Sequence, residues 1–165
     1  GKTFGVRDAV VHVGQGQDKI GDGGGHIAVV QNKTCAFSPR VAVLQVGGSV
    51  ELFNADPLMH NINMTLDTRT VVNVAMVPGG TPVRKPLMKE GLHLLKCNIH
   101  KFMQAYRHVF NDPFFDQTND VGEFRIQGLP PGAHSVSVWH ETLGVLYKGI
   151  QVPSSGVVQV EFEYK

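Results

Sequence analysis

Short apolar runs alternate with turn-forming residues along the whole chain. The runs are rich in Val, Leu, Ile and Phe, and Gly- and Pro-containing turns such as Gly47-Gly48 and Pro130-Pro131-Gly132 separate them. No stretch of 12 or more residues shows the period of an amphipathic helix, and the best helix candidate is the short piece after His100. We therefore predict an all-β protein built from sandwiches or barrels. The predicted strands are Ala9–Val13, His26–Val30, Ala42–Val46, Val50–Phe53, Asn61–Leu66, Thr70–Val77, Leu92–Cys97, Tyr106–Phe110, Glu123–Ile126, Ser135–Trp139, Leu146–Val152 and Val157–Tyr164.

The chain changes character near Asn111. Residues 26–110 contain both cysteines and all five methionines, whereas residues 111–165 contain neither type. We predict one domain over residues 26–110 and a second over residues 111–165. Because the second region alone is marginal for an independent core, we expect strands from residues 1–25 to complete it. The first domain is then inserted within the second.

Charge and hydropathy exclude two classes of protein. The formal net charge is +1 and no Lys/Arg cluster rises above the background, so we expect no nucleic-acid binding. No run of about 18 apolar residues is present, so we expect a chain that does not span a membrane. The sequence opens on Gly1 without a methionine, which leads us to expect an exported, periplasmic or extracellular chain whose signal peptide is removed. A shortened version of a longer protein would look the same.

Soft metal ligands are closely spaced at the end of one predicted strand. Cys97, His100 and Met103 follow the pattern Cys-x2-His-x2-Met, and a loop of that length can aim a thiolate, an imidazole and a thioether at one point. One cysteine, two histidines and a weak axial methionine favour copper that cycles between Cu(I) and Cu(II). His60, just after another strand, supplies the second imidazole. We predict one mononuclear copper ion bound by His60, Cys97, His100 and Met103. The alternatives for the axial position are Met59, Met64 and Gln104.

Four motifs resemble the cupredoxins in their order and spacing. They are residues 34–39, residues 44–54, the pair His60-Asn61 and residues 91–103. The Cys-x2-His-x2-Met loop resembles the short ligand loop of the amicyanins. The resemblance implies a Greek-key β-sandwich with copper near one end, in which Asn61 links the two ligand loops by hydrogen bonds. It also implies that electrons leave through His100.

Residues 115–132, followed by His134–His140, resemble the carboxypeptidase regulatory-like module, which is a small transthyretin-like β-sandwich. The resemblance rests on a short strand, the Leu129-Pro130-Pro131-Gly132 turn and an alternating strand after it. Together the two parts resemble exported cupredoxin proteins of the methylamine-utilisation type.

Cys35 leaves three interpretations open. In the cupredoxins its position points inward near the metal, so it can lie close to Cys97. It is a buried free thiol, or an additional sulfur ligand, or it forms a disulfide with Cys97. An exported protein permits that disulfide, which would remove the metal-binding thiolate.

The expected function is transfer of single electrons to or from a redox partner, such as a c-type cytochrome or a membrane-bound redox complex. Pro57, Leu58 and Phe102 are expected to form an apolar docking patch around His100. The alternative is a copper-free structural or interaction subunit of a larger extracytoplasmic assembly, with both cysteines in a disulfide.

We expect no enzyme activity. The acidic residues nearest to the proposed site are Asp56 and Glu90, and neither is placed convincingly for acid–base catalysis. We interpret both as ordinary solvated loop carboxylates.

Overall fold

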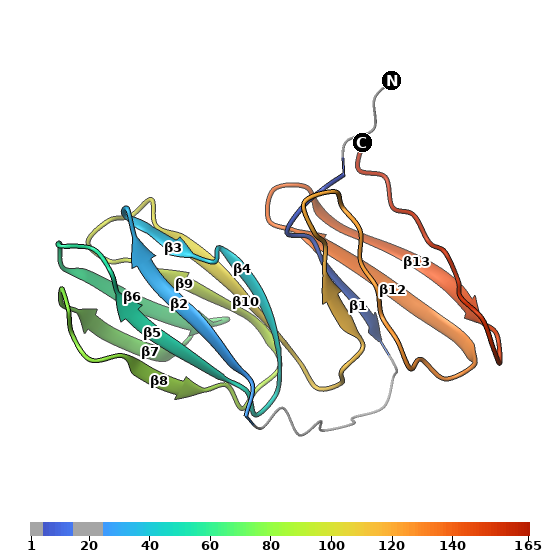
Figure 1. Ribbon diagram of the computed structural model, residues 1–165, viewed down its shortest axis with the longest axis horizontal. Coiled ribbons are helices and arrows are strands. Elements are labelled where there is room, and N and C mark those ends of the chain that lie inside the picture. Colours follow the sequence, from blue (N-terminus) through green and yellow to red (C-terminus); the bar gives the residue numbers. More distant parts are fainter. Residues whose placement is uncertain (1–4, 15–24) are drawn as a thin grey trace. The chain divides into compact units, whose positions relative to one another are not determined.

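The computed structural model describes residues 5–14 and 25–165, and these residues form strands and connecting segments (Figure 1). No helix is present in the described residues, so none of them forms a helix that could cross a membrane. The prediction of an all-β protein is confirmed. The short piece after His100 is a turn at Lys101 and Phe102, not a helix.

The described chain divides into two compact units. Residues 25–111 form the larger unit, and residues 5–14 together with residues 112–165 form the smaller one.

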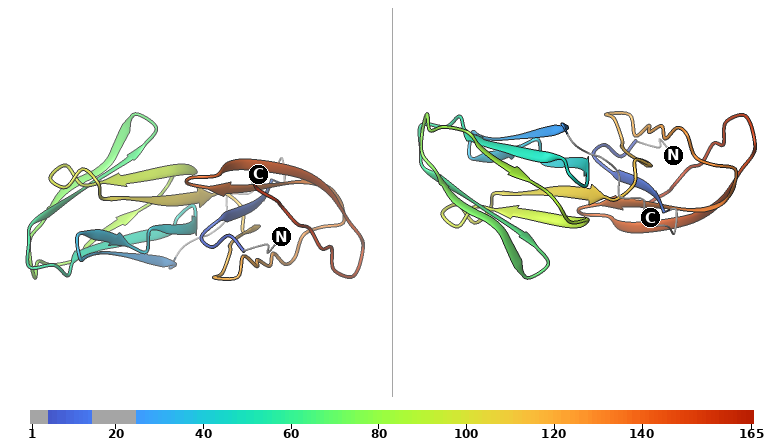
Figure 2. Two further views of the ribbon diagram at one scale, coloured as in Figure 1. Left: turned by 90° about the horizontal axis from the view of Figure 1, so that it is seen from above. Right: turned by 90° about the horizontal axis from the view of Figure 1, so that it is seen from below.

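The larger unit is a sandwich of two sheets, which Figure 2 shows as separate layers. One sheet has five strands in the order β4-β10-β9-β6-β7, and the other has four in the order β3-β2-β5-β8. Two neighbouring pairs are parallel, β2 with β5 and β4 with β10. The strands are β2 (Ile27–Lys33), β3 (Ala36–Ser38), β4 (Val41–Gln45), β5 (Ser49–Asn54), β6 (His60–Leu66), β7 (Arg69–Met76), β8 (Val83–Pro86), β9 (Gly91–Lys96) and β10 (Gln104–Phe110).

Period-two alternation decides which side chains enter the core of this unit. On β6, His60, Ile62 and Met64 are fully buried, while the residues between them are partly exposed. On β9, Leu95 is buried, Lys96 is exposed and Cys97 is buried just past the strand end. Successive side chains of a strand point to opposite faces, so His60 and Cys97 continue the inward-facing rows of their strands.

The register of β6 and β9 brings these two rows to the same end of the sandwich. The strands are antiparallel, with Met64 opposite Leu95 and Asn63 opposite Lys96. The start of β6 therefore lies beside the end of β9, and the sheet places His60 near the loop that Cys97 opens.

The smaller unit contains a four-stranded sheet in the order β11-β1-β12-β13. Its core includes Val11 and Val13 from β1 and Val136 and Val138 from β12. The strands are β1 (Val10–Gly14), β11 (Phe115–Gln117), β12 (Gly132–His140) and β13 (Gly144–Val152).

Two predicted strands of the smaller unit are wrong. Residues 123–126 and 157–164 belong to no strand, although Phe124, Ile126, Phe162 and Tyr164 pack against its core. Alternating burial requires an extended chain but not a hydrogen-bonded neighbour, so the pattern alone does not establish a sheet. Conversely, the short strands β3, β8 and β11 were not predicted, because three or four residues carry too little alternation to read.

Candidate metal centre

The Cys97–Met103 loop is closed by its own hydrogen bonds. The Cys97 N–H donates to the Met103 carbonyl at 3.3 Å, and the Met103 N–H donates to the His100 carbonyl at 3.0 Å. The His100 N–H donates to Cys97 Sγ at 3.3 Å. A backbone N–H directed at sulfur stabilises a thiolate. The loop therefore returns the chain to β10 while it presents a sulfur and an imidazole to the same space.

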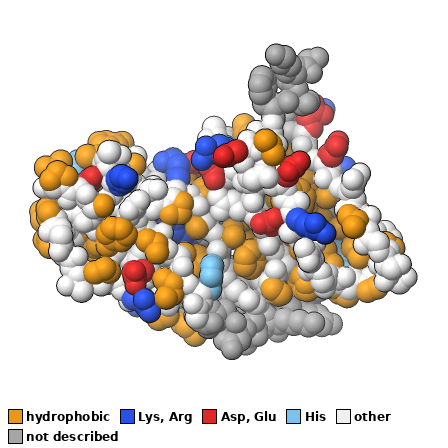
Figure 3. All heavy atoms as spheres, in the orientation of Figure 1, with side chains coloured by type: hydrophobic (Ala, Val, Ile, Leu, Met, Phe, Trp, Pro, Cys, Tyr) orange, Lys and Arg blue, Asp and Glu red, His pale blue; other side chains and the backbone are white. Residues whose placement is uncertain are grey.

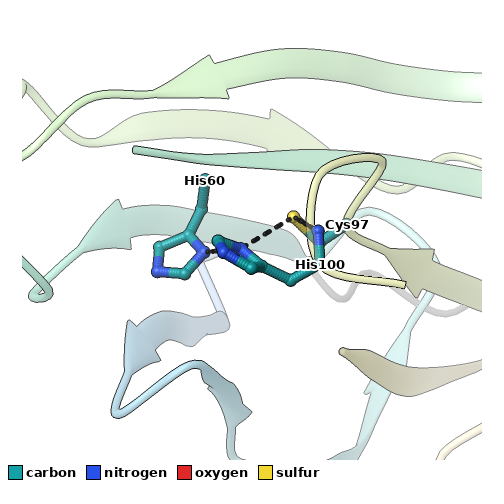
Figure 4. A group of neighbouring side chains, drawn as sticks. All are labelled: His60, Cys97 and His100. Atoms are coloured by element: carbon teal, nitrogen blue, oxygen red, sulfur yellow. Dashed lines mark hydrogen bonds between the residues drawn. The ribbon is translucent and has the colours of Figure 1, made fainter. Parts of the chain in front are cut away.

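The side chains of His60, Cys97 and His100 converge at this end of the sandwich (Figure 4). One donor atom of each lies within 4.8 Å of the others. The two Nδ1 atoms are 3.1 Å apart, and Cys97 Sγ is 3.9 Å from His100 Nδ1. His60 is fully buried and Cys97 is 2% exposed, whereas His100 is partly exposed. The structure thus brings three of the four predicted ligands together.

Asp56 lies behind His60, on the side away from this group. The His60 Nε2–H donates to Asp56 Oδ2 at 2.8 Å. A carboxylate only accepts, so the proton of the imidazole is fixed on Nε2, and the unprotonated Nδ1 faces His100 Nδ1 at 3.1 Å. This is the tautomer that binding of a metal through Nδ1 requires.

The Asp56 carboxylate is held ionised by its surroundings. Burial alone raises the pKa of Asp56, but hydrogen bonds from the Cys35 N–H, from His60 and from the Thr34 N–H outweigh burial. The net effect is a pKa below the ordinary value of an aspartate. Asp56 therefore remains a negative partner of His60 at neutral pH.

The expectation that Asp56 is a solvated loop carboxylate is wrong. Asp56 is 9% exposed, because Asn54 folds the β5–β6 loop inward. Asn54 Nδ2 donates to the Leu58 and Met76 carbonyls at 2.7 and 2.8 Å, and Asn54 Oδ1 accepts the Asp56 N–H at 3.0 Å. The available sequence signal was the spacing of an aspartate four residues before a predicted ligand. Glu90, in contrast, is exposed.

Cys35 lies near the site but outside the group that contains Cys97. Both cysteines are free, so the disulfide, one of the three interpretations of Cys35, is absent. Cys35 is partly buried and belongs to a second group with Asp56 and His60, whose donor atoms lie within 4.8 Å of one another. Thr34 and Cys35 form the β2–β3 turn with φ of 52° and 55°, and both N–H groups donate to Asp56.

The remaining predicted residues are placed as follows. Met103 is buried in the same core cluster as Cys97, and its thioether as a metal ligand stays a prediction. Asn61 Oδ1 accepts the Asn98 N–H at 3.3 Å, which connects β6 to the Cys97–Met103 loop. The predicted patch residues Pro57, Leu58 and Phe102 are all exposed.

Comparisons with known proteins give structural neighbours only. No protein-family model matches the chain, and no curated protein matches it. Amicyanin from Paracoccus versutus is 16% identical, with 52% of this chain and 82% of amicyanin aligned at a TM-score of 0.46. A purple cupredoxin from Nitrosopumilus maritimus is 20% identical, with 50% of this chain and 98% of that protein aligned at 0.43. A copper-containing nitrite reductase from Thermus scotoductus is 24% identical, with 52% of this chain and 22% of the reductase aligned at 0.44.

These alignments cover about half of the chain. The resemblance of the C-terminal region to a transthyretin-like module stays a prediction.

The donor set fits copper. A thiol and two imidazoles are the soft and intermediate ligands that suit copper in both of its common oxidation states. The site is largely closed to water, His60 has the required tautomer, and Cys97 Sγ accepts a backbone N–H. Each of these properties comes from the residues of this chain.

Proposed function

We propose that this chain binds one copper ion through His60, Cys97 and His100, with Met103 as a weak fourth ligand, and carries single electrons. The proposal rests on the convergence of two Nδ1 atoms and one Sγ within 4.8 Å of one another. Copper in such a site gains and loses one electron with little change in its ligands. The protein contributes a fixed tautomer at His60 and a partly exposed edge at His100.

The partner in this proposal is another redox protein, such as a c-type cytochrome or a membrane-bound redox complex, in an exported compartment. The chain itself is proposed to have no catalytic turnover. The neighbouring carboxylate, Asp56, is occupied by three hydrogen bonds that it accepts, so it is not available as a general base.

Titration of the purified apoprotein with Cu(II) tests the proposal. We expect one equivalent to bind and an intense sulfur-to-copper absorption band at about 600 nm. The Cys97→Ser variant should lose the band, and the matched Cys35→Ser variant should keep it. Thiol counts on the apoprotein should give two reactive groups.

Two results contradict the proposal. Binding of Zn(II) with no visible band on Cu(II) addition indicates a closed structural site. Absence of reactive thiols indicates the disulfide-linked, copper-free subunit instead.

A further inference from the structure

The end of the larger unit that carries the metal centre has an apolar middle. Four large hydrophobic side chains are exposed in the β5–β6 and Cys97–Met103 loops: Leu58 (53%), Met59 (52%), Ile99 (49%) and Phe102 (70%). The Phe102 ring lies 5.9 Å from the His100 ring, so the apolar middle adjoins the partly exposed ligand. In Figure 3, hydrophobic side chains cover much of this end, on the left, where β2 ends in Figure 1.

Four exposed cations lie at the same end of the larger unit. Lys33 ends β2, Arg40 precedes β4, Lys96 ends β9 and Lys101 lies in the Cys97–Met103 loop. The connecting segments at this end, residues 33–40, 54–60, 76–82 and 96–104, contain a single carboxylate, the buried Asp56. The end is therefore locally cationic although the whole chain has a formal charge of only +1.

The exposed carboxylates of the larger unit lie elsewhere. Asp67 is in the β6–β7 turn and Glu90 is in the β8–β9 loop, both at the opposite ends of their strands. Glu51 lies within β5 and pairs with Arg84 at 2.7 Å. The two ends of the sandwich thus differ in charge, because only the opposite end carries exposed acids.

A hollow of about 300 Å³ opens beside the metal-binding cysteine. Its lining is formed by Lys96, Cys97, Asn98 and Lys101. Lys96 and Lys101 each end in an ammonium group, a positively charged hydrogen-bond donor that attracts an anionic side chain. The hollow therefore suits a carboxylate from a bound protein.

We propose that this end of the larger unit docks a redox protein with an acidic docking surface, and that a carboxylate of that protein binds between Lys96 and Lys101. The inference deepens the proposed electron-transfer function and rests on it. Opposite charges on two docking faces raise encounter rates by about 10- to 1,000-fold at low ionic strength. The exposed apolar side chains then supply a water-excluding contact around His100.

Oxidation of the reduced, copper-loaded protein by two small oxidants of opposite charge tests the sign of this face. Stopped-flow rates with hexacyanoferrate(III), an anion, should fall about tenfold as ionic strength rises from about 10 to 300 mM. Rates with tris(phenanthroline)cobalt(III), a cation, should rise over the same range. The same salt dependence for both oxidants overturns the proposal.

A charge-reversed variant locates the effect. In Lys96→Glu/Lys101→Glu, the ratio of the anion rate to the cation rate should fall at least about tenfold at low salt. Any change in the reduction potential of the copper alters the driving force for both oxidants alike, so it cancels in this ratio. The matched control, Arg69→Glu/Lys89→Glu, has the same net charge change at the opposite end and should alter the ratio less than about twofold. If the glutamate substitutions impair folding, the variant Lys96→Gln/Lys101→Gln removes the two positive charges without adding negative ones. Equal effects of the two charge-reversed variants overturn the proposal.

Protein probes then test the class of partner. Electron exchange with a c-type cytochrome whose haem edge is ringed by acidic residues should be faster than with one ringed by lysines, and Lys96→Glu/Lys101→Glu should reverse the order. Binding to phosphatidylglycerol vesicles that this variant abolishes, or a homodimer that it dissociates, overturns the proposal in favour of another occupant. A chain that takes up no copper, or exchanges no electrons with either small oxidant, contradicts the proposed function itself.

Discussion

Replacing Asp56 by asparagine removes one negative charge while it keeps the size and shape of the side chain. Asp56 Oδ1 accepts the Thr34 N–H at 2.6 Å, and Oδ2 accepts the Cys35 N–H at 2.9 Å and the His60 Nε2–H at 2.8 Å. An asparagine amide has only one oxygen. An NH2 group therefore replaces the acceptor either at the Oδ1 position, beside Thr34, or at the Oδ2 position, beside Cys35 and His60. If the NH2 faces Thr34, two donors oppose each other. If it faces His60, the imidazole must move its proton to Nδ1, which then cannot bind a metal.

Both outcomes have a calculable cost. One unsatisfied buried donor destabilises the fold by about 1–3 kcal/mol. Loss of a carboxylate behind a metal-binding histidine weakens metal binding by about 10- to 100-fold. The negative charge stabilises Cu(II) more than Cu(I), so each tenfold loss of Cu(II) affinity that Cu(I) does not share raises the reduction potential by about 59 mV.

The measurements are competitive copper titrations in both oxidation states, a spectroelectrochemical potential and a denaturant curve for the apoprotein. Asp112→Asn is a matched control in the smaller unit, because Asp112 Oδ2 bonds His12 Nε2 at 3.0 Å and Oδ1 accepts the Phe114 N–H at 2.9 Å. We expect Asp112→Asn to lower stability without altering copper affinity or potential. If Asp56→Asn leaves Cu(II) affinity within twofold and the potential within about 10 mV, Asp56 does not tune the site and our reasoning is refuted.

Four further predictions concern neighbouring residues. Cys35→Ser should leave the visible band in place, and loss of colour in this variant identifies Cys35 as a ligand. Met103→Leu should keep the copper and raise its potential in a redox titration, because a weak donor is removed; an unchanged potential shows that the thioether does not bind. Burial lowers the pKa of His93, so the unfolded chain binds more protons as pH falls through about 6.5, and unfolding free energy should fall by up to about 1.4 kcal/mol per pH unit there. The His93→Gln variant should lack that component in denaturant curves at pH 7.5 and 5.5. Thr34→Gly should raise stability by about 1 kcal/mol, because a β-branched residue is strained at φ of 52°, and a loss of stability contradicts this.

The spacing of Cys97, His100 and Met103 led to the candidate site, and strand alternation explains why two of its residues are buried. The inward rows of β6 and β9 are visible in the sequence, and Cys97 and His60 belong to those rows, so their burial follows from strand geometry alone. His100 could be predicted as a third ligand, because it lies three residues after Cys97 in a tight loop and its ring can occupy few positions there.

Asp56 could not be found in the same way. Its position depends on Asn54, which clamps the β5–β6 loop, and on the turn at Thr34 and Cys35, whose N–H groups point at the carboxylate. That turn reaches Asp56 because β2 and β5 are parallel neighbours, with Asn32 opposite Asn54. Parallel pairing between separate segments leaves no periodic trace in the sequence, so the carboxylate looked like an ordinary loop residue.

The four proposed ligands differ in exposure, and under the proposed function this difference determines where electrons enter. His60, Cys97 and Met103 are each at most 2% exposed, whereas the His100 ring is partly open. His60, whose Nε2–H donates to the Asp56 carboxylate, is thus shielded from solvent. Water therefore does not compete for this hydrogen bond. Electron transfer slows steeply with distance, so we expect the proposed redox partner to approach over His100 rather than over His60. The exposed apolar side chains and the cations lie in the loops at that same end, and a substitution there should change the rate of electron exchange while the absorption spectrum and the potential stay close to those of the parent protein.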